Sequence, residues 1–214
     1  MIDLVMFDAD GVLFESDESN IAYYNAIFER IGEPPLTPEE ERACVFLAGG
    51  QVFESRARGD LEKVKLMHEL GRSLDFAPFF KLLRPPVELR PFMLELKRRY
   101  RLGLATNRSA TIPAVIDHLN LSDVFDAVAS ARDEVQPKPA PDILELCMSR
   151  ASAKPENSVY VGDSEVDSQA AAAARCMFLG VGARIKCENW VEKLELLPAM
   201  LDGLLRPLNR HVKA

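Results

Sequence analysis

The sequence has no long hydrophobic run and no excess of basic charge. No apolar stretch reaches the length of about 18 residues that a membrane-spanning helix needs. The first residues also lack a basic segment followed by a cleavage site. Acidic residues outnumber basic ones by 33 to 26, for a formal net charge of −7, whereas nucleic acids are bound by concentrated Lys and Arg. We therefore expect a cytoplasmic protein that binds neither membranes nor nucleic acid.

Cysteine and histidine are also scarce. The chain has four cysteines and three histidines. Cys44, Cys147, Cys176 and Cys187 show neither CxxC spacing nor a matching histidine pattern. This distribution predicts reduced and mostly packed thiols, and it argues against disulfides or a zinc site.

The sequence does contain a regular alternation of apolar and helical segments, which begins near residue 90. Alternating strands and helices predict β-α-β units and a parallel sheet that is covered by helices on both faces. We therefore predict an α/β fold with a five-stranded Rossmann-like core sheet. The expected strands are Ile2–Phe7, Leu102–Ala105, Ala127–Ala129, Ser158–Val161 and Phe178–Val181. The expected helices of this part are Pro91–Tyr100, Ala110–Leu119, Pro141–Arg150 and Glu165–Ala174.

Residues 17–84 lack this alternation and show helical spacing instead. Tyr23, Ile27 and Ile31 lie one helical turn apart. Thr37–Glu40 (TPEE) has the capping-box pattern, with proline at the first helical position. The expected domains are a catalytic core of residues 1–15 and 88–214 and an inserted helical cap of residues 16–87.

Two aspartates, Asp8 and Asp10, follow the first expected strand in the segment DADG. In an open α/β sheet, ligands bind beyond the carboxyl ends of the strands, and Gly11 permits a tight turn there. Two carboxylates this close repel each other, so one of them resists ionisation unless a cation neutralises the pair. A divalent metal with oxygen ligands removes this cost. The alternative is a solvated turn after a strand, and this motif alone does not decide between the two.

Polar side chains also follow three other expected strands. Thr106 and Asn107 offer a hydroxyl group and backbone amides, Lys138 offers a cation beside a proline, and residues 162–167 (GDSEVD) offer further carboxylates. Together with Asp8, these groups suit phosphoryl transfer, because that chemistry depends on positioning and charge stabilisation.

These segments resemble, in their order, the four motifs of the haloacid dehalogenase superfamily. The matches are DADGVLF at 8–14, TN at 106–107, KPAPD at 138–142 and GDSEVD at 162–167. The similarity covers roughly residues 1–15 and 88–185, and it points to the phosphoglycolate-phosphatase-like branch, whose members carry a helical cap after the first motif. The resemblance implies a sheet of strand order 5-4-1-2-3.

The resemblance also implies a role for each matching residue. Asp8 would attack phosphorus and form an aspartyl-phosphate, and Asp10 would protonate the leaving alcohol and then activate water. Thr106 and Lys138 would bind the oxygens of the transferred phosphoryl group. The residues whose backbone amides would assist are Ala9, Asp10 and Asn107.

A magnesium ion is implied as the cofactor. Its ligands would be the Asp8 carboxylate, the Asp10 carbonyl and Asp163, with waters completing the octahedron. Asp167 has two expected roles, which do not exclude each other. It completes a capping box with Ser164, and in the family an acid at this position often supports the metal through water.

Two further places are candidates for substrate contacts. Arg108 puts a guanidinium group beside the phosphate site, and the alternative is a surface charge near the start of a helix. The loop Phe46–Gln51 matches the position of a substrate-specificity loop in relatives. Gly49 and Gly50 in this loop are candidate substrate-binding residues, with a simple helix break as the preferred alternative.

We therefore predict an enzyme, a magnesium-dependent phosphatase that acts on a small phosphorylated metabolite as a monomer or weak dimer. Asp10 argues against a dehalogenase, because the dehalogenases of the family lack the second aspartate. A sugar phosphomutase of the same family is one alternative, and a non-catalytic binding protein on a relic fold is another. Phosphoglycolate, a sugar phosphate and a nucleotide monophosphate stay open as substrates. Because the cap is joined to the core at residues 14–17 and 84–88, we also predict a hinge there.

Overall fold

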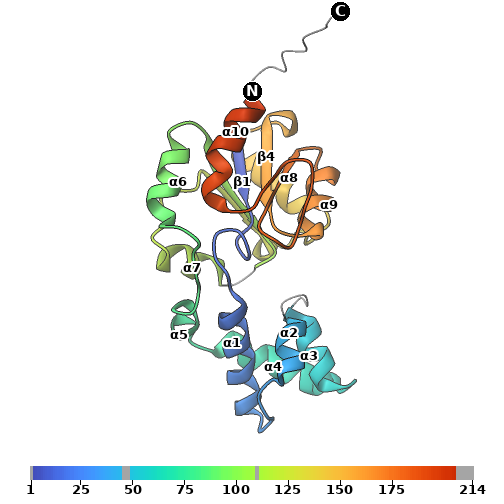
Figure 1. Cartoon of the computed structure of the whole chain (residues 1–214). Coiled ribbons are helices and arrows are strands. Elements are labelled where there is room, and N and C mark those ends of the chain that lie inside the picture. The colour runs from blue at the N-terminus through green and yellow to red at the C-terminus, as the bar shows by residue number, and fades with distance from the viewer. Residues whose placement is uncertain (1, 45–48, 109–110, 206–214) are drawn as a thin grey trace, which may run out of the picture. The chain divides into compact units, whose positions relative to one another are not determined.

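The structure is a computed structural model that describes residues 2–44, 49–108 and 111–205 (Figure 1). The chain divides into two compact units. One unit is formed by Met1–Phe14 together with Pro85–Ala214, and the other by Glu15–Arg84. Within the described part of the chain, no helix has both the length and the apolar character that crossing a membrane requires.

The first unit contains a parallel sheet of six strands in the described part of the chain, with the order β3-β2-β1-β4-β5-β6. The strands are β1 (Leu4–Phe7), β2 (Arg101–Thr106), β3 (Ala127–Ser130), β4 (Ser158–Gly162), β5 (Met177–Val181) and β6 (Trp190–Val191). The five expected strands and their implied order are confirmed, but the expected total of five is wrong. The sixth strand has only two residues, which is too short to produce a readable hydrophobic period.

Helices cover the sheet on both faces. They are α6 (Leu89–Lys97), α7 (Ile112–His118), α8 (Asp142–Arg150), α9 (Glu165–Ala173) and α10 (Leu197–Leu205), with short 3₁₀ segments at Ala131–Asp133, Pro155–Asn157 and Leu194–Leu196. Figure 1 shows α6 on one side of β1 and α8 and α9 on the other. Helix α10 has no counterpart among the helices expected from the sequence, because most of its positions (LPAMLDGLL) are apolar and no polar face marks a period.

The strand β1 is buried over its whole length. Leu4 and Met6 pack in one cluster with Ile143 of α8 and Ala170 of α9. Val5 and Phe7 alternate with them along the strand and point to the opposite face. A strand covered on both sides reads as a continuous apolar run, which is why LVMF was recognisable in the sequence.

The register of the central strands determines where their carboxyl ends lie. Phe7 at the end of β1 pairs with Leu104 of β2 and with Val161 of β4. Because the three strands are parallel, the residues that follow them emerge at one edge of the sheet. This edge therefore receives the polar segments that begin at Asp8, Thr106 and Asp163.

The second unit is helical. Its helices are α1 (Asp17–Arg30), α2 (Pro38–Cys44), α3 (Gly49–Ala57), α4 (Leu61–Ser73) and α5 (Ala77–Phe80). They enclose a separate apolar core that includes Ile27, Phe28, Phe53 and Met67. Its two chain ends are joined, because Glu15 and Arg84 exchange backbone hydrogen bonds of 2.9 and 3.0 Å.

Two sequence predictions concern short segments of this unit. The predicted capping box is present, since the Thr37 N–H donates to Glu40 Oε2 (2.8 Å) and the Glu40 N–H donates to Thr37 Oγ1 (3.3 Å). In the predicted specificity loop, residues 46–48 lie outside the described residues, whereas Gly49 begins α3. The role of Gly49 and Gly50 in substrate binding stays a prediction.

Candidate active site

Asp8 lies directly after β1 and is buried, with 8% of its surface exposed. Its N–H donates to the carbonyl of Val161 (2.9 Å), which ties the turn to β4. Gly11 in this turn has a φ of +78°, and a Cβ there would lie 2.0 Å from Asp163 Oδ2. Only glycine allows the turn to pass so close to the second acidic segment.

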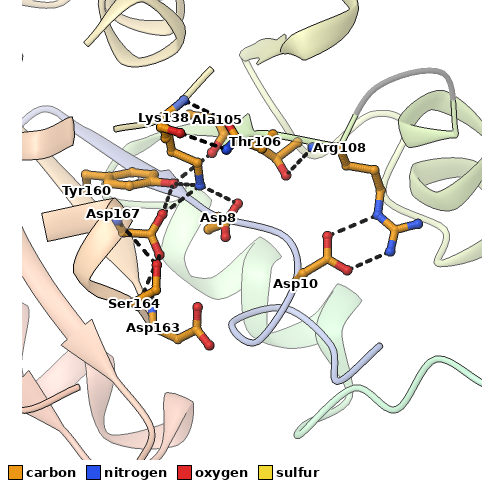
Figure 2. A network of polar contacts seen from close by, with 11 residues as sticks. Asp8, Asp10, Ala105, Thr106, Arg108, Lys138, Tyr160, Asp163, Ser164 and Asp167 are labelled. Atoms are coloured by element: carbon orange, nitrogen blue, oxygen red, sulfur yellow. Dashed lines mark hydrogen bonds and ion pairs between the residues drawn. The ribbon is translucent and has the colours of Figure 1, made fainter. Parts of the chain in front are cut away.

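Lys138 is the cation at the centre of the cluster. Its ammonium group lies 2.9 Å from Asp8 Oδ1 and 2.6 Å from Asp167 Oδ1, and it donates a hydrogen bond to the Tyr160 hydroxyl (2.7 Å) (Figure 2). Burial alone would lower the pKa of Lys138, but the two aspartates outweigh burial and hold it above its usual value. The lysine is therefore a fixed positive charge.

Asn107 holds the backbone of this lysine. Its Oδ1 accepts from the Lys138 N–H (2.8 Å), and its Nδ2 donates to the Lys138 carbonyl (3.1 Å). The side chain of Asn107 therefore fixes the loop that carries Lys138. The role expected from the sequence was that of its backbone amide, and the contribution of that amide to phosphate binding stays a prediction.

Asp167 is buried and uses both carboxylate oxygens. Oδ2 accepts from the N–H groups of Asp163 (3.2 Å) and Ser164 (3.1 Å) and from the Ser164 hydroxyl (2.5 Å). The Asp167 N–H in turn donates to Ser164 Oγ (3.3 Å), so that α9 begins with the predicted capping box. Its other oxygen faces Lys138. Support of a metal through water, the second expected role, stays a prediction.

Three carboxylates converge at this edge. Asp8, Asp163 and Asp167 are all buried, and one oxygen of each lies within 4.8 Å of the others. Burial raises the pKa of Asp8 to about 7, with Lys138 opposing the shift and Asp167 and Asp10 adding to it. Burial also raises the pKa of Asp163 to about 6, with Asp167 adding to the shift. The cluster is therefore short of positive charge.

Asp10 faces away from the three carboxylates and pairs with Arg108. Arg108 Nε donates to Asp10 Oδ2 (3.0 Å) and Nη2 donates to Oδ1 (2.6 Å), as Figure 2 shows. The guanidinium carbon also lies 5.6 Å from the centre of the Phe14 ring. The side chain of Arg108 is only 14% exposed. Its charge is thus directed at Asp10.

Two further predicted residues, Thr106 and Ala9, belong to the same unit as this network. Thr106 is the last residue of β2 and is buried, and its hydroxyl oxygen accepts from the Arg108 N–H (3.2 Å). Ala9 lies in the turn between the two aspartates and is also buried. Gly49 and Gly50 belong to the helical unit.

Two residues of the site were missed in the sequence. The Tyr160 hydroxyl donates to the carbonyl of Ala105 (2.9 Å) and accepts from Lys138. Arg184, in the loop after β5, has its Nη1 3.1 Å from Asp163 Oδ2. Tyr160 sits in the apolar segment SVYVG, which predicts only a strand, and no motif marks Arg184.

The fold and the cluster together define a class of α/β protein in which carboxylates and one lysine meet at the carboxyl edge of a parallel sheet. The model of the haloacid dehalogenase-like hydrolase family matches residues 5–181. The chain therefore belongs to this family, and both the resemblance and the prediction of an enzyme are confirmed.

Similar proteins agree with this assignment. Phosphoglycolate phosphatase of Pseudomonas putida is 28% identical over 95% of this chain and 80% of its own length. Pyrophosphatase PpaX of Halalkalibacterium halodurans is 26% identical over 94% of this chain and 96% of its own length. A crystal structure of a subfamily IA hydrolase of this superfamily from Geobacter sulfurreducens has a TM-score of 0.79 at 28% identity, and covers 94% of this chain and 96% of its own.

Proposed function

We propose that the protein is a magnesium-dependent phosphatase that hydrolyses small phosphomonoesters through an aspartyl-phosphate at Asp8. The observation that carries the proposal is the placement of Asp8, buried at the carboxyl end of β1 with the Lys138 ammonium 2.9 Å away. Relatives named phosphoglycolate phosphatase and pyrophosphatase support a phosphoester hydrolase.

In the first step, an oxygen of Asp8 attacks phosphorus while the bond from phosphorus to the leaving alcohol oxygen breaks. Lys138 offsets negative charge on the transferred oxygens, since its ammonium group is fixed between two carboxylates. Thr106 and the amides of the turn after β1 would bind these oxygens. In the second step, water attacks the aspartyl-phosphate, which releases inorganic phosphate and restores Asp8.

Asp10 is proposed to move the proton in both steps. It would give a proton to the leaving alcohol and later take one from the attacking water. In the structure both of its oxygens accept hydrogen bonds from Arg108, which stabilises the ionised carboxylate. We expect Arg108 to loosen its hold on at least one of these oxygens when Asp10 is protonated, because the neutral carboxyl group attracts the guanidinium charge less. A direct contact between Arg108 and phosphate, the expected substrate role of this residue, stays a prediction.

The residues present fit a magnesium ion. Asp8, Asp163 and the backbone carbonyl of Asp10 offer oxygen ligands, which this hard cation prefers. Asp8 Oδ1 is buried, and among the described residues it accepts no hydrogen bond of good geometry, although the Lys138 ammonium lies nearby. A bound magnesium ion would supply positive charge that brings the carboxylate and the phosphate together.

A phosphatase fits the acidic segment better than a sugar phosphomutase does. The mutases of the family usually carry glutamate where this chain has Gly162, and glycine at the later acidic position, here Asp167. A Cβ at Gly162 would lie 2.4 Å from the Cβ of Asp167. Gly162 and Asp167 therefore belong together for steric reasons, and the chain has the phosphatase-like combination. Beta-phosphoglucomutase of Bacillus subtilis is nevertheless 26% identical over 83% of this chain.

The test is phosphate release by the purified protein from a panel of phosphoglycolate, sugar phosphates, nucleotide monophosphates and pyrophosphate. At least one substrate should be hydrolysed with magnesium, and EDTA should abolish the activity. Asp8→Asn keeps the shape but removes the nucleophile, so activity should fall by at least about a thousandfold. A folded Asp8→Asn protein that keeps most of its activity would contradict the mechanism.

Asp10→Asn separates acid–base catalysis from metal binding. Only the carbonyl of Asp10 is assigned to the metal, so magnesium affinity should change little. Turnover should slow by roughly 10²–10⁴-fold, because the proton donor is lost. An Asp10→Asn enzyme with normal turnover would show that the proton is moved by another group.

A further inference from the structure

Arg184 contacts one of the carboxylates that is proposed to bind the metal. Its Nη1 lies 3.1 Å from Asp163 Oδ2, the oxygen that also faces Gly11 across the turn after β1. The carboxylate is 9% exposed, whereas the arginine side chain is 36% exposed. A long side chain from the loop after β5 therefore reaches from solvent to a buried acid.

This contact partly relieves the charge of the acidic cluster. Burial and Asp167 raise the pKa of Asp163, and the charge of Arg184 acts against them. A guanidinium group and a magnesium ion near the same carboxylate would repel each other. They would also compete for the lone pairs of the Asp163 carboxylate, so each would weaken the binding of the other.

The other two cations of the site, Lys138 and Arg108, are less exposed and more firmly held than Arg184. The Lys138 side chain is 3% exposed and is held by two carboxylates and a hydroxyl. Arg108 is 14% exposed and is bound to Asp10 through both of its carboxylate oxygens. Arg184 is the most exposed of the three, and its displacement into solvent would leave the buried network of Lys138 unchanged.

We infer that Arg184 is an exchangeable counter-ion, which neutralises Asp163 when no metal is bound and is displaced from it when magnesium binds. This inference rests on the proposed metal site. It gives Arg184 a role in setting the affinity for magnesium, separate from the chemical steps. The physical prediction is that removal of the guanidinium group tightens magnesium binding.

The experiment is a calorimetric titration of the full-length, EDTA-treated protein with magnesium chloride in the absence of substrate. Arg184→Gln should bind magnesium about three- to tenfold more tightly than the unchanged protein, the range expected for loss of a partly exposed charge pair. Arg184→Lys should lie between the two. Arg150→Gln is the matched control, because Arg150 pairs with Asp133 at 2.6 Å with a side chain that is 41% exposed. Its affinity should be unchanged.

Thermal unfolding provides a second readout, which a merely structural role would not produce. Arg184→Gln should lower the melting temperature by roughly 1–3 °C in EDTA, and by less in saturating magnesium, because the pair with Asp163 is then already broken. Arg150→Gln should lower it equally in both conditions.

Asp163→Asn distinguishes failure of this inference from failure of the metal site. If Asp163→Asn loses magnesium affinity while Arg184→Gln has unchanged or weaker affinity, the metal site stands and the counter-ion role is wrong. If Asp163→Asn binds magnesium as the unchanged protein does, or if the unchanged protein binds none, both assignments are overturned.

Discussion

Asp8 with Lys138 at the sheet edge and Asp123 with Arg90 on the surface of the same unit are both close acid–cation pairs. Their oxygen–nitrogen distances are 2.9 and 2.6 Å. The pKa of Asp8 is nevertheless raised to about 7, because burial opposes its ionisation more than Lys138 favours it. The pKa of Asp123 is lowered to about 2, because hydrogen bonds from Arg90 dominate where burial is slight.

The difference shows that burial, more than the partner, determines what an aspartate can do. In an exposed pair, the carboxylate stays ionised and solvated, and the pair contributes little to the stability of the fold. A buried pair has a large desolvation cost, which is tolerated only where the remaining charges and hydrogen bonds are arranged around it. Buried carboxylates with shifted pKa values are common in active sites.

The largest expected effect comes from removing the buried cation. Lys138→Met leaves the carboxylates of Asp8 and Asp167 buried without their positive partner. The free energy of unfolding should therefore fall by about 3–5 kcal/mol. Lys97→Met is the control, because Lys97 pairs with Asp126 at 2.8 Å but both side chains are about a third exposed. Its cost should stay below about 1 kcal/mol. Urea unfolding of both variants in EDTA measures the contrast, and equal losses would contradict the distinction.

A smaller effect is expected at Tyr160. Tyr160→Phe removes an acceptor for Lys138 and a donor to the carbonyl of Ala105, so the free energy of unfolding should fall by about 1–2 kcal/mol. Hydrolysis should slow as well, since the ammonium group is less firmly held.

Tyr100 offers a matched control for this change. Its hydroxyl is also buried, but it has no hydrogen-bond partner among the described residues. Tyr100→Phe should therefore be neutral or slightly stabilising. If the two variants unfold at the same urea concentration, the Tyr160 hydroxyl has no structural role in holding Lys138.

The smallest effect is expected at the surface pair. The folded-state pKa of Asp123, about 2, lies below the ordinary value of 3.8. Asp123 therefore stabilises the fold above about pH 4, and this contribution is lost as the pH falls toward 2. Arg90→Gln should bring the pKa of Asp123 back toward 3.8, as measured by NMR titration of its carboxyl carbon. An unchanged pKa would show that Arg90 is not the cause of the shift.

Within the sequence, local patterns determined most of the scaffold. The apolar run LVMF, the capping boxes of Thr37 and Ser164 and the alternation after residue 90 each depend on residues within a few positions of one another. The polar residues at strand ends were recognisable for a different reason, which is that the carboxyl ends of parallel strands share one edge of the sheet. The two-residue β6 and the apolar α10 were not predicted, because neither shows a recognisable hydrophobic periodicity. The predicted hinge between the two units stays a prediction.

Only the tertiary structure decided which charges meet. Asp10 and Arg108 are 98 residues apart, Lys138 and Asp167 are 29 apart, and Asp163 and Arg184 are 21 apart. The motifs marked Asp10, Lys138 and Asp163 as important, but nothing near Arg184 in the sequence indicates its partner. Pairing of this kind depends on how loops from different strands approach one another, and on how deeply each carboxylate is buried there. Both are properties of the packed sheet edge, and no local pattern encodes them.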